Sequence, residues 1–411
     1  MKILNRFVIA LCASLLSSTS VYAMSFGNYD PRSLAMGGTG VSHANIDHAA
    51  YYNPALLSVA QEDDDFSLLA PTVGVRVYDP DDFLDALQDH QDGNYETALS
   101  DAIDAFNATP SSPALLQDVV DNAQLLKDSY VNISDKILDF EIHAGAGLAV
   151  PSKTLGVALS ANGRIMSGIV LNVSQADKDL LQKYINLDPS VYSAGVSFNS
   201  ANLTSTASVR GALIIEGGLS LSHEFESLDK WSIGITPKTV QVDTYDYVVA
   251  VENSEIDEDK GKLSYTDTNI DIGLAKRISE GWKVGLVVKN AIEKEYKTAL
   301  GNTIVLEPTV RTGISHHTNW TTIAVDLDLT ENESIGLTGE KTQYAAIGME
   351  FDLALLQLRV GARHNLGAVG NAESNTVSAG VGLYIFGLHV DAGVAGNDDE
   401  VEAAIQAGFQ F

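Results

Sequence analysis

The chain has 411 residues, and its 54 acidic residues against 25 basic ones give a formal net charge of -29. A surface of this sign repels nucleic-acid phosphates, which excludes nucleic acid as a partner. The single cysteine, Cys12, lies within the first 23 residues, so structural disulfides, thiol catalysis and cysteine-bound metals are excluded from the rest of the chain.

Residues 1–23 have the pattern of a signal peptide for export. A positively charged start precedes the apolar run Phe7–Leu16, which is too short to span a bilayer, and cleavage is expected after Ala23. An uncleaved anchor and a lipoprotein signal cut before Cys12 are the alternatives. Because no later segment has about 18 uninterrupted apolar residues, we expect an exported protein without a helical anchor.

Residues 24–62 form a segment rich in glycine and aromatic residues. Gly37, Gly38 and Gly40 oppose regular helix or strand, because glycine loses the most backbone entropy on ordering. The segment is nevertheless too apolar for a disordered linker. Pro54 fixes a turn, and Asn53 before it is biased towards extended geometry. The pattern predicts a compact, irregular segment that surrounding protein must hold.

Residues 80–135 are expected to form a helical insert. Asp81 or Asp82 is the expected cap of a first helix, and Ser112 followed by Pro113 is a strong start signal for a later one. The apolar stripes of these helices either pack against each other and the rim of the fold or cover an apolar mouth.

From residue 137 onward, apolar and polar residues alternate with a period of two, which is typical of strands between two environments. The last strand places Val401, Ile405 and Phe409 on one face and Glu402 and Gln406 on the other. The expected strands are 66–78, 137–150, 155–172, 206–223, 231–249, 264–278, 281–296, 302–317, 320–331, 341–353, 356–367, 375–386, 387–396 and 400–411.

This pattern predicts an all-β fold, a transmembrane antiparallel β-barrel of about 14 strands over residues 63–411, with the helical insert in its first outer loop. Short turns and longer loops alternate along the chain, as they do in outer-membrane barrels. A soluble β-sandwich or a β-rich secreted enzyme is the alternative, and strands of 12 or more residues disfavour it. Since a lumen of this width needs filling, residues 24–62 are expected to be its plug, or hatch.

The hatch carries a resemblance to a known group of proteins. The matching residues resemble the hatch motif of the long-chain fatty acid transporter FadL superfamily, whose members have 14-stranded barrels with an N-terminal plug: Arg32, Met36, Gly37, Gly40, Asn53, Pro54 and Ala55. A closer resemblance is to the conjugal transfer protein TraF family of Gram-negative bacteria, which combines this hatch with an acidic segment, here residues 61–82, and a helical insert. This is the barrel type of TraF, since the chain lacks the cysteines and the strand–helix alternation of the thioredoxin-like type.

No catalytic residues are expected, because the sequence has no Gly-x-Ser-x-Gly elbow, no His-Glu-x-x-His and no phosphate loop. We therefore expect no enzyme, no cofactor and no metal site. Charged residues on the polar faces of the strands are candidates for contacts with the hatch or with the headgroup of a luminal ligand: Arg210, Glu216, Arg359 and Arg363.

The resemblance implies an outer-membrane barrel that is a diffusion channel or binding protein for a hydrophobic small molecule. The alternative is a structural or docking component of a conjugation or envelope assembly. The expected partners are outer-membrane lipid, the barrel assembly machinery that reads the terminal Phe411, and an envelope or conjugation protein. The identity of the ligand, the movement of the hatch and the oligomeric state are left open by the sequence.

Overall fold

The computed structural model describes residues 26–27, 30–59, 65–192, 198–251, 261–368 and 374–410. The expected signal peptide, residues 1–23, and the terminal Phe411 lie outside the described residues.

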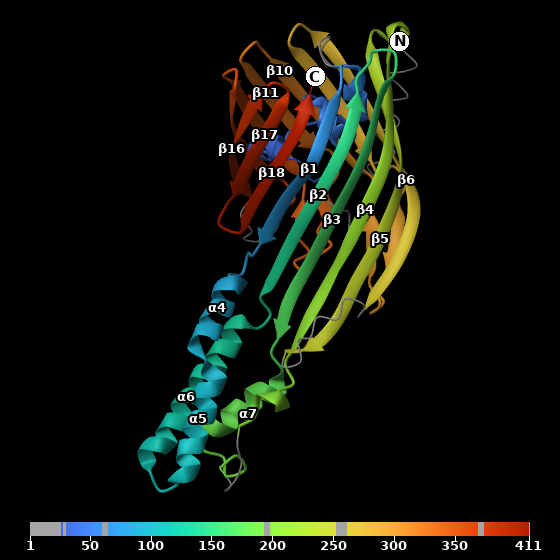
Figure 1. Ribbon diagram of the computed structural model, residues 1–411. Helices are drawn as coiled ribbons and strands as arrows, with labels where there is room; N and C mark the ends of the chain where they lie inside the picture. The colour runs from blue at the N-terminus through green and yellow to red at the C-terminus, as the bar shows by residue number, and fades with distance from the viewer. Residues whose placement is uncertain are drawn as a thin grey trace.

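Fourteen antiparallel strands close into a barrel, in which the first strand pairs with the last (Figure 1). The expected barrel and its strand number are therefore confirmed. Its strands are β1 (Ser67–Tyr78), β2 (Ile137–Val150), β3 (Gly156–Asn172), β4 (Thr206–Phe225), β5 (Trp231–Ala250), β6 (Lys262–Ser279), β7 (Trp282–Lys289), β10 (Thr309–His317), β11 (Thr321–Asp328), β14 (Tyr344–Asp352), β15 (Leu356–Asn365), β16 (Asn375–Ile385), β17 (Leu388–Gly396) and β18 (Glu400–Gln410).

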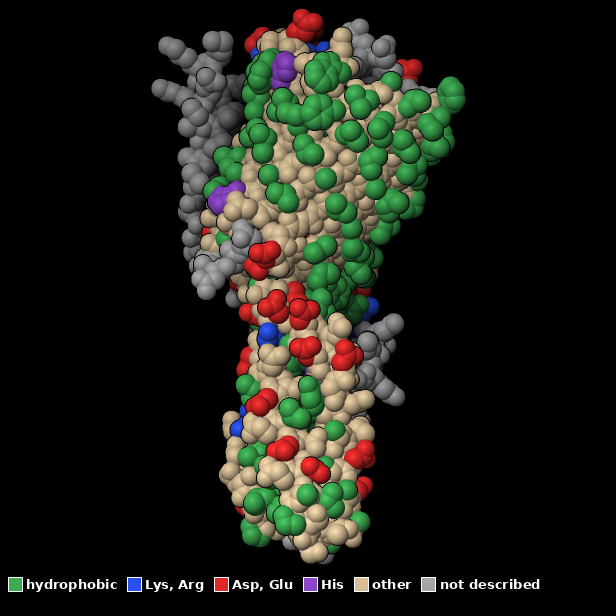
Figure 2. Space-filling model, turned by 90° about the vertical axis from the view of Figure 1, so that its left-hand side faces the viewer, with side chains coloured by type: hydrophobic (Ala, Val, Ile, Leu, Met, Phe, Trp, Pro, Cys, Tyr) green, Lys and Arg blue, Asp and Glu red, His purple; other side chains and the backbone are tan. Residues whose placement is uncertain are grey.

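The alternation in sequence becomes an apolar outside and a polar inside. On β11, Ile323 and Val325 are exposed, whereas Asp326 and Asp328 are buried in the lumen. Figure 2 shows hydrophobic side chains spread over the barrel wall, while acidic side chains gather at the base of the barrel and along the helices. An apolar exterior around a charged interior is the pattern of a barrel surrounded by hydrocarbon.

Two of the expected strands, 281–296 and 302–317, were too long. The strand β7 ends at Lys289 because Asn290 adopts a positive φ of 51°. The chain then forms a separate hairpin of β8 (Lys294–Lys297) and β9 (Thr303–Leu306), and a second small hairpin pairs β12 (Asn332–Glu333) with β13 (Lys341–Thr342). The alternation in fact breaks here, since apolar and polar residues come in pairs from Val287 to Ile292 and Pro308 precedes β10, and the expected strands ran across these breaks.

Four helices project from the end of the barrel opposite the labelled N and C ends of the chain (Figure 1): α4 (Phe83–Gly93), α5 (Tyr95–Ala108), α6 (Pro113–Ile133) and α7 (Gln175–Ile185). We refer to them as the stalk. Three of them, α5, α6 and α7, share an apolar core that includes Leu99, Val119, Leu126 and Leu181, whereas the buried residues of α4 pack with Ile133 and with residues of β2 and β3. None of the helices in the described ranges is long and apolar enough to cross a membrane.

The caps of the stalk helices differ in part from expectation. Asp82 precedes α4 with a positive φ of 55° and makes no side-chain cap bond; instead, the carboxylate of Asp79 accepts the N–H groups of Phe83 and Leu84 at 2.6 and 2.9 Å. The hydroxyl of Ser112 does cap α6.

A buried carboxylate ties α7 to the start of β4. Asp177 accepts the backbone N–H groups of Thr204 and Ser205 at 2.9 and 2.8 Å. Burial opposes its ionisation, but the hydrogen bonds from Ser205 and Thr204 outweigh burial and lower the pKa of Asp177. The stalk is thus anchored to the barrel at this second connection as well.

Residues 30–59 lie inside the barrel at the end that carries the chain termini, and we refer to them as the luminal segment (Figure 1). This segment is not irregular throughout, because it contains α2 (Pro31–Ala35), α3 (Ile46–Tyr52) and the 3-10 turn η1 (Pro54–Ser58). Contacts run from α2 to β15–β18, from α3 to β1–β3 and from η1 to β3–β6. The segment therefore touches the wall on opposite sides.

Glycines of the wall let the backbone of the luminal segment approach closely. A Cβ atom at Gly285 of β7 would lie 2.3 Å from the carbonyl oxygen of Val41, and one at Gly348 of β14 would lie 2.4 Å from that of Met36. Contacts this short are not sustained by real side chains, so these positions require glycine.

We predict that Gly285→Val destabilises the protein by about 1–3 kcal/mol, because the new side chain overlaps the luminal segment. Gly217→Val is the matched control, since a Cβ on this strand glycine meets no atom within 4 Å. Thermal unfolding of the two variants in detergent tests the difference. Equal midpoints would show that the luminal segment does not pack against β7.

Candidate functional site

Arg32 joins the luminal segment to the barrel wall. Asp30 caps α2 by accepting the N–H of Ser33 at 2.8 Å, which fixes the helix that presents Arg32 to the wall. The guanidinium then forms two hydrogen bonds of 2.8 Å with Glu350 of β14 and donates a third, at 3.1 Å, to the carbonyl oxygen of His43. A bidentate pair of this kind fixes geometry as well as charge.

The charge pairing continues along the wall. Glu350 also accepts from Arg359 of β15 at 2.7 Å, and Arg359 donates to Asp391 of β17 at 2.5 Å. Asp391 lies 2.8 Å from His389, whose other ring nitrogen is 3.2 Å from Asp47 of α3. This buried chain of alternating charges begins and ends on the luminal segment, with the wall residues between.

The glycine turns of the luminal segment are held by two aspartates of β11. Asp326 accepts the backbone N–H groups of Gly40 and Val41 at 2.8 and 3.0 Å. Arg311, paired with Asp328 at 2.5 Å, donates to the carbonyl oxygen of Gly38 at 3.0 Å. Backbone groups that no helix satisfies thus find partners in the wall.

Asn53 closes the luminal segment by linking three backbones. Its amide nitrogen donates to the carbonyl oxygens of Val41 and Leu274, each at 3.0 Å, and its oxygen accepts the N–H of Ala55 at 3.1 Å. Pro54 begins η1 directly afterwards. At the other end, Gly37 ends α2 with a φ of 72° that favours glycine.

The remaining charged candidates lie apart from this chain. Arg363 donates to both Glu400 and Glu402 of β18. Glu216 lies 2.7 Å from Lys238, which is also 2.9 Å from Asp271. Arg210 is half-buried on β4, and within the described ranges it forms no ion pair.

Neither Arg359 nor Arg363 therefore presents an unopposed charge to the lumen, since each lies between two carboxylates. Sequence reasoning did not single out Asp47, Glu350, His389 and Asp391 as members of the site. The inward parity of Glu350, His389 and Asp391 on their strands was the available signal, but their pairing depends on strands that are neighbours only in the folded barrel.

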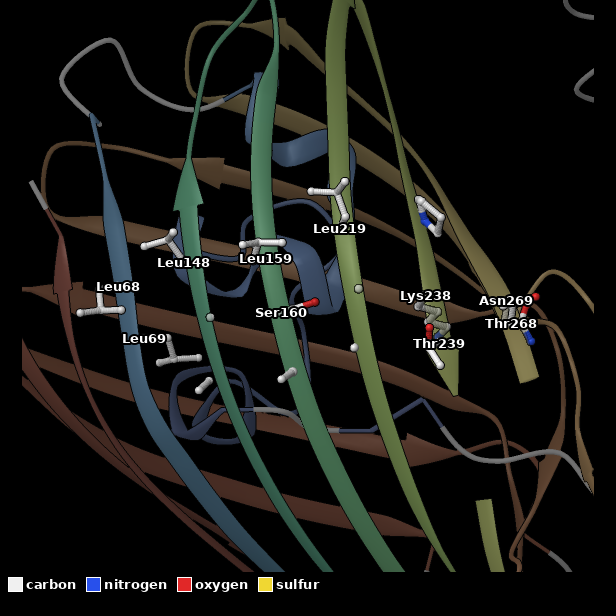
Figure 3. Close-up of a pocket in the computed structure, with 16 residues that line it drawn as sticks. Leu68, Leu69, Leu148, Leu159, Ser160, Leu219, Lys238, Thr239, Thr268 and Asn269 are labelled. Carbon is white, nitrogen blue, oxygen red and sulfur yellow. The ribbon is translucent and has the colours of Figure 1, made fainter. Parts of the chain in front are cut away.

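A shallow apolar depression of about 750 Å³ lies across β1–β6. Figure 3 shows its residues on adjacent strands, with the luminal segment behind the wall. Leu68, Leu148, Leu159 and Leu219 are paired in cross-strand register and form one row. The next row consists of small side chains in register, Ala146, Ala161 and Gly217. Small residues beside a leucine row make the surface concave.

The wall is irregular at both sides of this depression. The pairing of β1 with both of its neighbours shifts between Leu69 and Thr72 or Val73, a stretch that contains Pro71. On β5, Pro237 lies where the pairs with β4 are interrupted between Lys238 and Ile235. Proline cannot donate to a ladder, so each position removes a hydrogen bond from the wall.

The inner side of the depressed wall carries an apolar cluster of the luminal segment. Leu69 packs with Phe26, Tyr51 and Tyr52. The hydroxyl of Tyr51 donates to the carbonyl oxygen of Ala146 at 2.5 Å, and Ala146 also lines the depression. The depression and the luminal segment thus meet across a single sheet.

An apolar cluster lies in the outer half of the lumen, on the side of β3–β5. Residues from β3, β4 and β5 pack there with the two small hairpins: Met166, Ala212, Ile214, Val240, Val242, Tyr296, Ile304, Leu306 and Ile335. The second hairpin is held across the mouth by Asp139 of β2, which accepts the N–H of Leu337 at 2.9 Å. The outer lumen therefore contains an apolar cluster beside charged groups such as Arg76 and Glu340.

The chain is similar in sequence to one family of known proteins. Residues 50–328 match the family described as "F plasmid transfer operon, TraF, protein". No protein of curated function matches the sequence.

Among solved structures, a Pseudomonas aeruginosa FadL homologue is similar, with a TM-score of 0.53, 10% identity, and coverage of 95% of this chain and 99% of that one. The Pseudomonas putida toluene transporter TodX has a TM-score of 0.51, 13% identity and coverage of 94% and 99%. The Ralstonia pickettii toluene transporter TbuX has a TM-score of 0.51, 12% identity and coverage of 94% and 99%. At these identities the likeness concerns the fold, which is FadL-like.

We predict that Glu350→Gln lowers the free energy of unfolding by about 3–5 kcal/mol, because it leaves a buried Arg32 without its carboxylate. Lys276→Met is the control. It breaks a pair with Asp229, whose side chain is 91% exposed, and exposed pairs contribute less than about 1 kcal/mol. Denaturant unfolding compares the two, and similar losses would show that the charge chain does not hold the luminal segment.

Proposed function

This chain belongs to the F plasmid transfer operon TraF family and has a FadL-like fold, and from this premise we propose that it is an outer-membrane channel through which a hydrophobic small molecule diffuses. The observation that carries the proposal is the apolar depression across β1–β6, which lies directly over the apolar cluster of the luminal segment.

The chemistry of the wall favours an apolar molecule at this place. On the outside, the side chains of the leucine row and of the small residues beside it have no hydrogen-bonding group. A hydrocarbon that leaves the bilayer for this row therefore does not have to desolvate a polar group. The side chain of Leu69, which is 1% exposed, stands at the irregular part of β1, between the depression and the luminal cluster. Local bending of β1 would connect the two.

The lumen also offers apolar surface to a hydrophobic molecule. In the outer half of the lumen, apolar residues on the inner wall of β3–β5 are covered by the hairpin residues Tyr296, Ile304 and Leu306. TodX and TbuX are named as toluene transporters. We extend to this chain only the class of molecule, a small hydrophobic compound, and not its identity.

The segments take their roles from this proposal. Residues 1–23 are the signal peptide, residues 24–62 the hatch and residues 63–411 the barrel, with the insert over 80–135. The exposed apolar side chains of the wall contact outer-membrane lipid, and Phe411 is the residue that the barrel assembly machinery reads. Hatch contacts are the role we propose for Arg32, Asn53 and Arg359.

We predict that Gly217→Trp reduces uptake of radiolabelled toluene by cells that produce the protein to near the level of cells that lack it. The indole would fill the floor of the depression, where a Cβ at Gly217 meets open space. Ala379→Trp is the control, because this residue also faces outward but lies on β16, away from the depression. Full uptake by the Gly217 variant would contradict a route through this part of the wall.

A second role, docking to a conjugation or envelope protein, is favoured by the stalk. Its helices α5, α6 and α7 bury an apolar core of their own, which the barrel does not need to cover, and the stalk projects well beyond the wall. The family description points to the same kind of role.

Replacement of residues 80–135 by a short turn separates the two roles. If the stalk docks a transfer component, plasmid transfer from cells that carry only this variant falls while toluene uptake stays unchanged. Unchanged transfer would remove the docking role.

A further inference from the structure

We propose that His389 is a pH-sensitive positioning residue, which fixes α3 of the luminal segment to the barrel wall as long as its imidazole ring is protonated. Its effect on transport rests on the proposed channel function, but its effect on the luminal segment does not.

Both ring nitrogens of His389 face carboxylates. Nδ1 of His389 lies 2.8 Å from Oδ2 of Asp391, and Nε2 lies 3.2 Å from Oδ2 of Asp47. The side chains of all three residues are 0% exposed. A carboxylate oxygen only accepts, and a neutral imidazole has one donor nitrogen. Both contacts are favourable together only when the ring is an imidazolium.

The two carboxylates differ in their other partners. Asp391 also accepts hydrogen bonds from the guanidinium of Arg359 at 2.5 Å and from the side-chain amide of Gln406 at 3.0 Å. Asp47 has only His48, whose Nδ1 lies 3.0 Å away, as its second ionic partner within the described ranges. When His389 loses a proton, Asp391 therefore keeps its other partners, and the remaining N–H of the ring is the one on Nδ1, which points to Asp391. The carboxylate of Asp47 then faces the lone pair of Nε2.

The other neighbours of the ring do not replace the lost charge. The ring of Tyr384 stacks on His389 with centroids 5.1 Å apart and an angle of 15°. Of the charged groups around these carboxylates, Arg359 is already bound to Asp391 and Glu350, and His48 lies beside Asp47. The contact between Asp47 and His389 is consequently the one that depends on the proton.

A space near the ring opens at the end of the barrel with short turns. A polar cavity of about 310 Å³ lies there between the luminal segment and the wall. Its lining includes Asn45 and Ile46, next to Asp47, and also Tyr384, which stacks on His389, and Arg359, which pairs with Asp391. Asn45 donates to the hydroxyl of Tyr384 at 3.1 Å, across this space.

Loss of the proton would loosen α3 more than α2. Arginine stays charged at every relevant pH, so the pair of Arg32 with Glu350 persists. Local release of residues 46–52 beneath the apolar depression would then leave space between the luminal segment and the wall.

Hydrogen exchange of the full-length protein in lipid nanodiscs tests this inference, because it follows residues 46–52 directly. At each pH, the exchange rate of residues 46–52 in the wild type is divided by the rate in His389→Arg. We expect this ratio to be one near about pH 6 and to rise by at least about tenfold towards about pH 10. The arginine keeps the charge, and comparison at equal pH removes the intrinsic rate. His364→Gln, which changes an exposed histidine, should behave as the wild type does.

Two further variants keep the test decisive. His389→Gln and Asp47→Asn should both show fast exchange of residues 46–52 at every pH, with no added rise relative to His389→Arg. If the wild type and His389→Arg stay equal across the range, or if His48→Gln alone abolishes the rise, the assignment to His389 is overturned.

Toluene uptake measured on the same variants separates this inference from the proposed function. A pH-dependent exchange without any uptake would leave the positioning role intact and remove the channel. Uptake that is the same for the wild type and His389→Arg at high pH, together with equal exchange, would retain the channel and remove the switch.

Discussion

A lumen enclosed by fourteen strands is too wide for the side chains of the wall to fill, and the rest of the structure depends on how this space is occupied. Here a segment of the chain itself lies inside, and its backbone needs partners for groups that no regular structure satisfies. The wall supplies them through close contacts at glycines such as Gly285 and Gly348, and through buried carboxylates such as Asp326. The polar groups of the barrel interior thus serve as binding partners for this segment.

Buried charge pairs fix the position of the luminal segment more than they raise the stability of the protein. Breaking a buried pair costs several kcal/mol, yet replacing a pair by apolar residues of similar size often does not destabilise a protein. The chain of pairs runs from Arg32 to Asp47 through Glu350, Arg359, Asp391 and His389, and it therefore contributes more to the position of the luminal segment than to net stability. Directional pairs fix the segment in one place against the wall. The apolar surfaces on both sides of β1–β6 then remain for contact with a hydrophobic molecule.

The fold followed from the sequence more completely than the candidate site did. Alternation along β11 and β18 gave the barrel and the inward direction of Asp326 and Glu402. The hairpin of β8 and β9 was missed because the expected strands ran across a stretch where the alternation breaks, which the structure marks by the positive φ of Asn290. Arg359 was identified as an inward charge, but its partners Glu350 and Asp391 lie on neighbouring strands. Which inward groups pair is set by strand register, which the sequence pattern specifies only to within a few residues.

The sequence by itself determined the class of the fold, the presence of a stalk and the segment that would need a surrounding wall. These follow from local periodicity and from the backbone limits of glycine and proline, which act over a few residues. Only the tertiary structure decided that the leucines of β1–β4 form one row, that the luminal segment lies behind that row, and that His389 stands between two carboxylates. Such relations join residues up to several hundred positions apart, and they exist only once the barrel has closed.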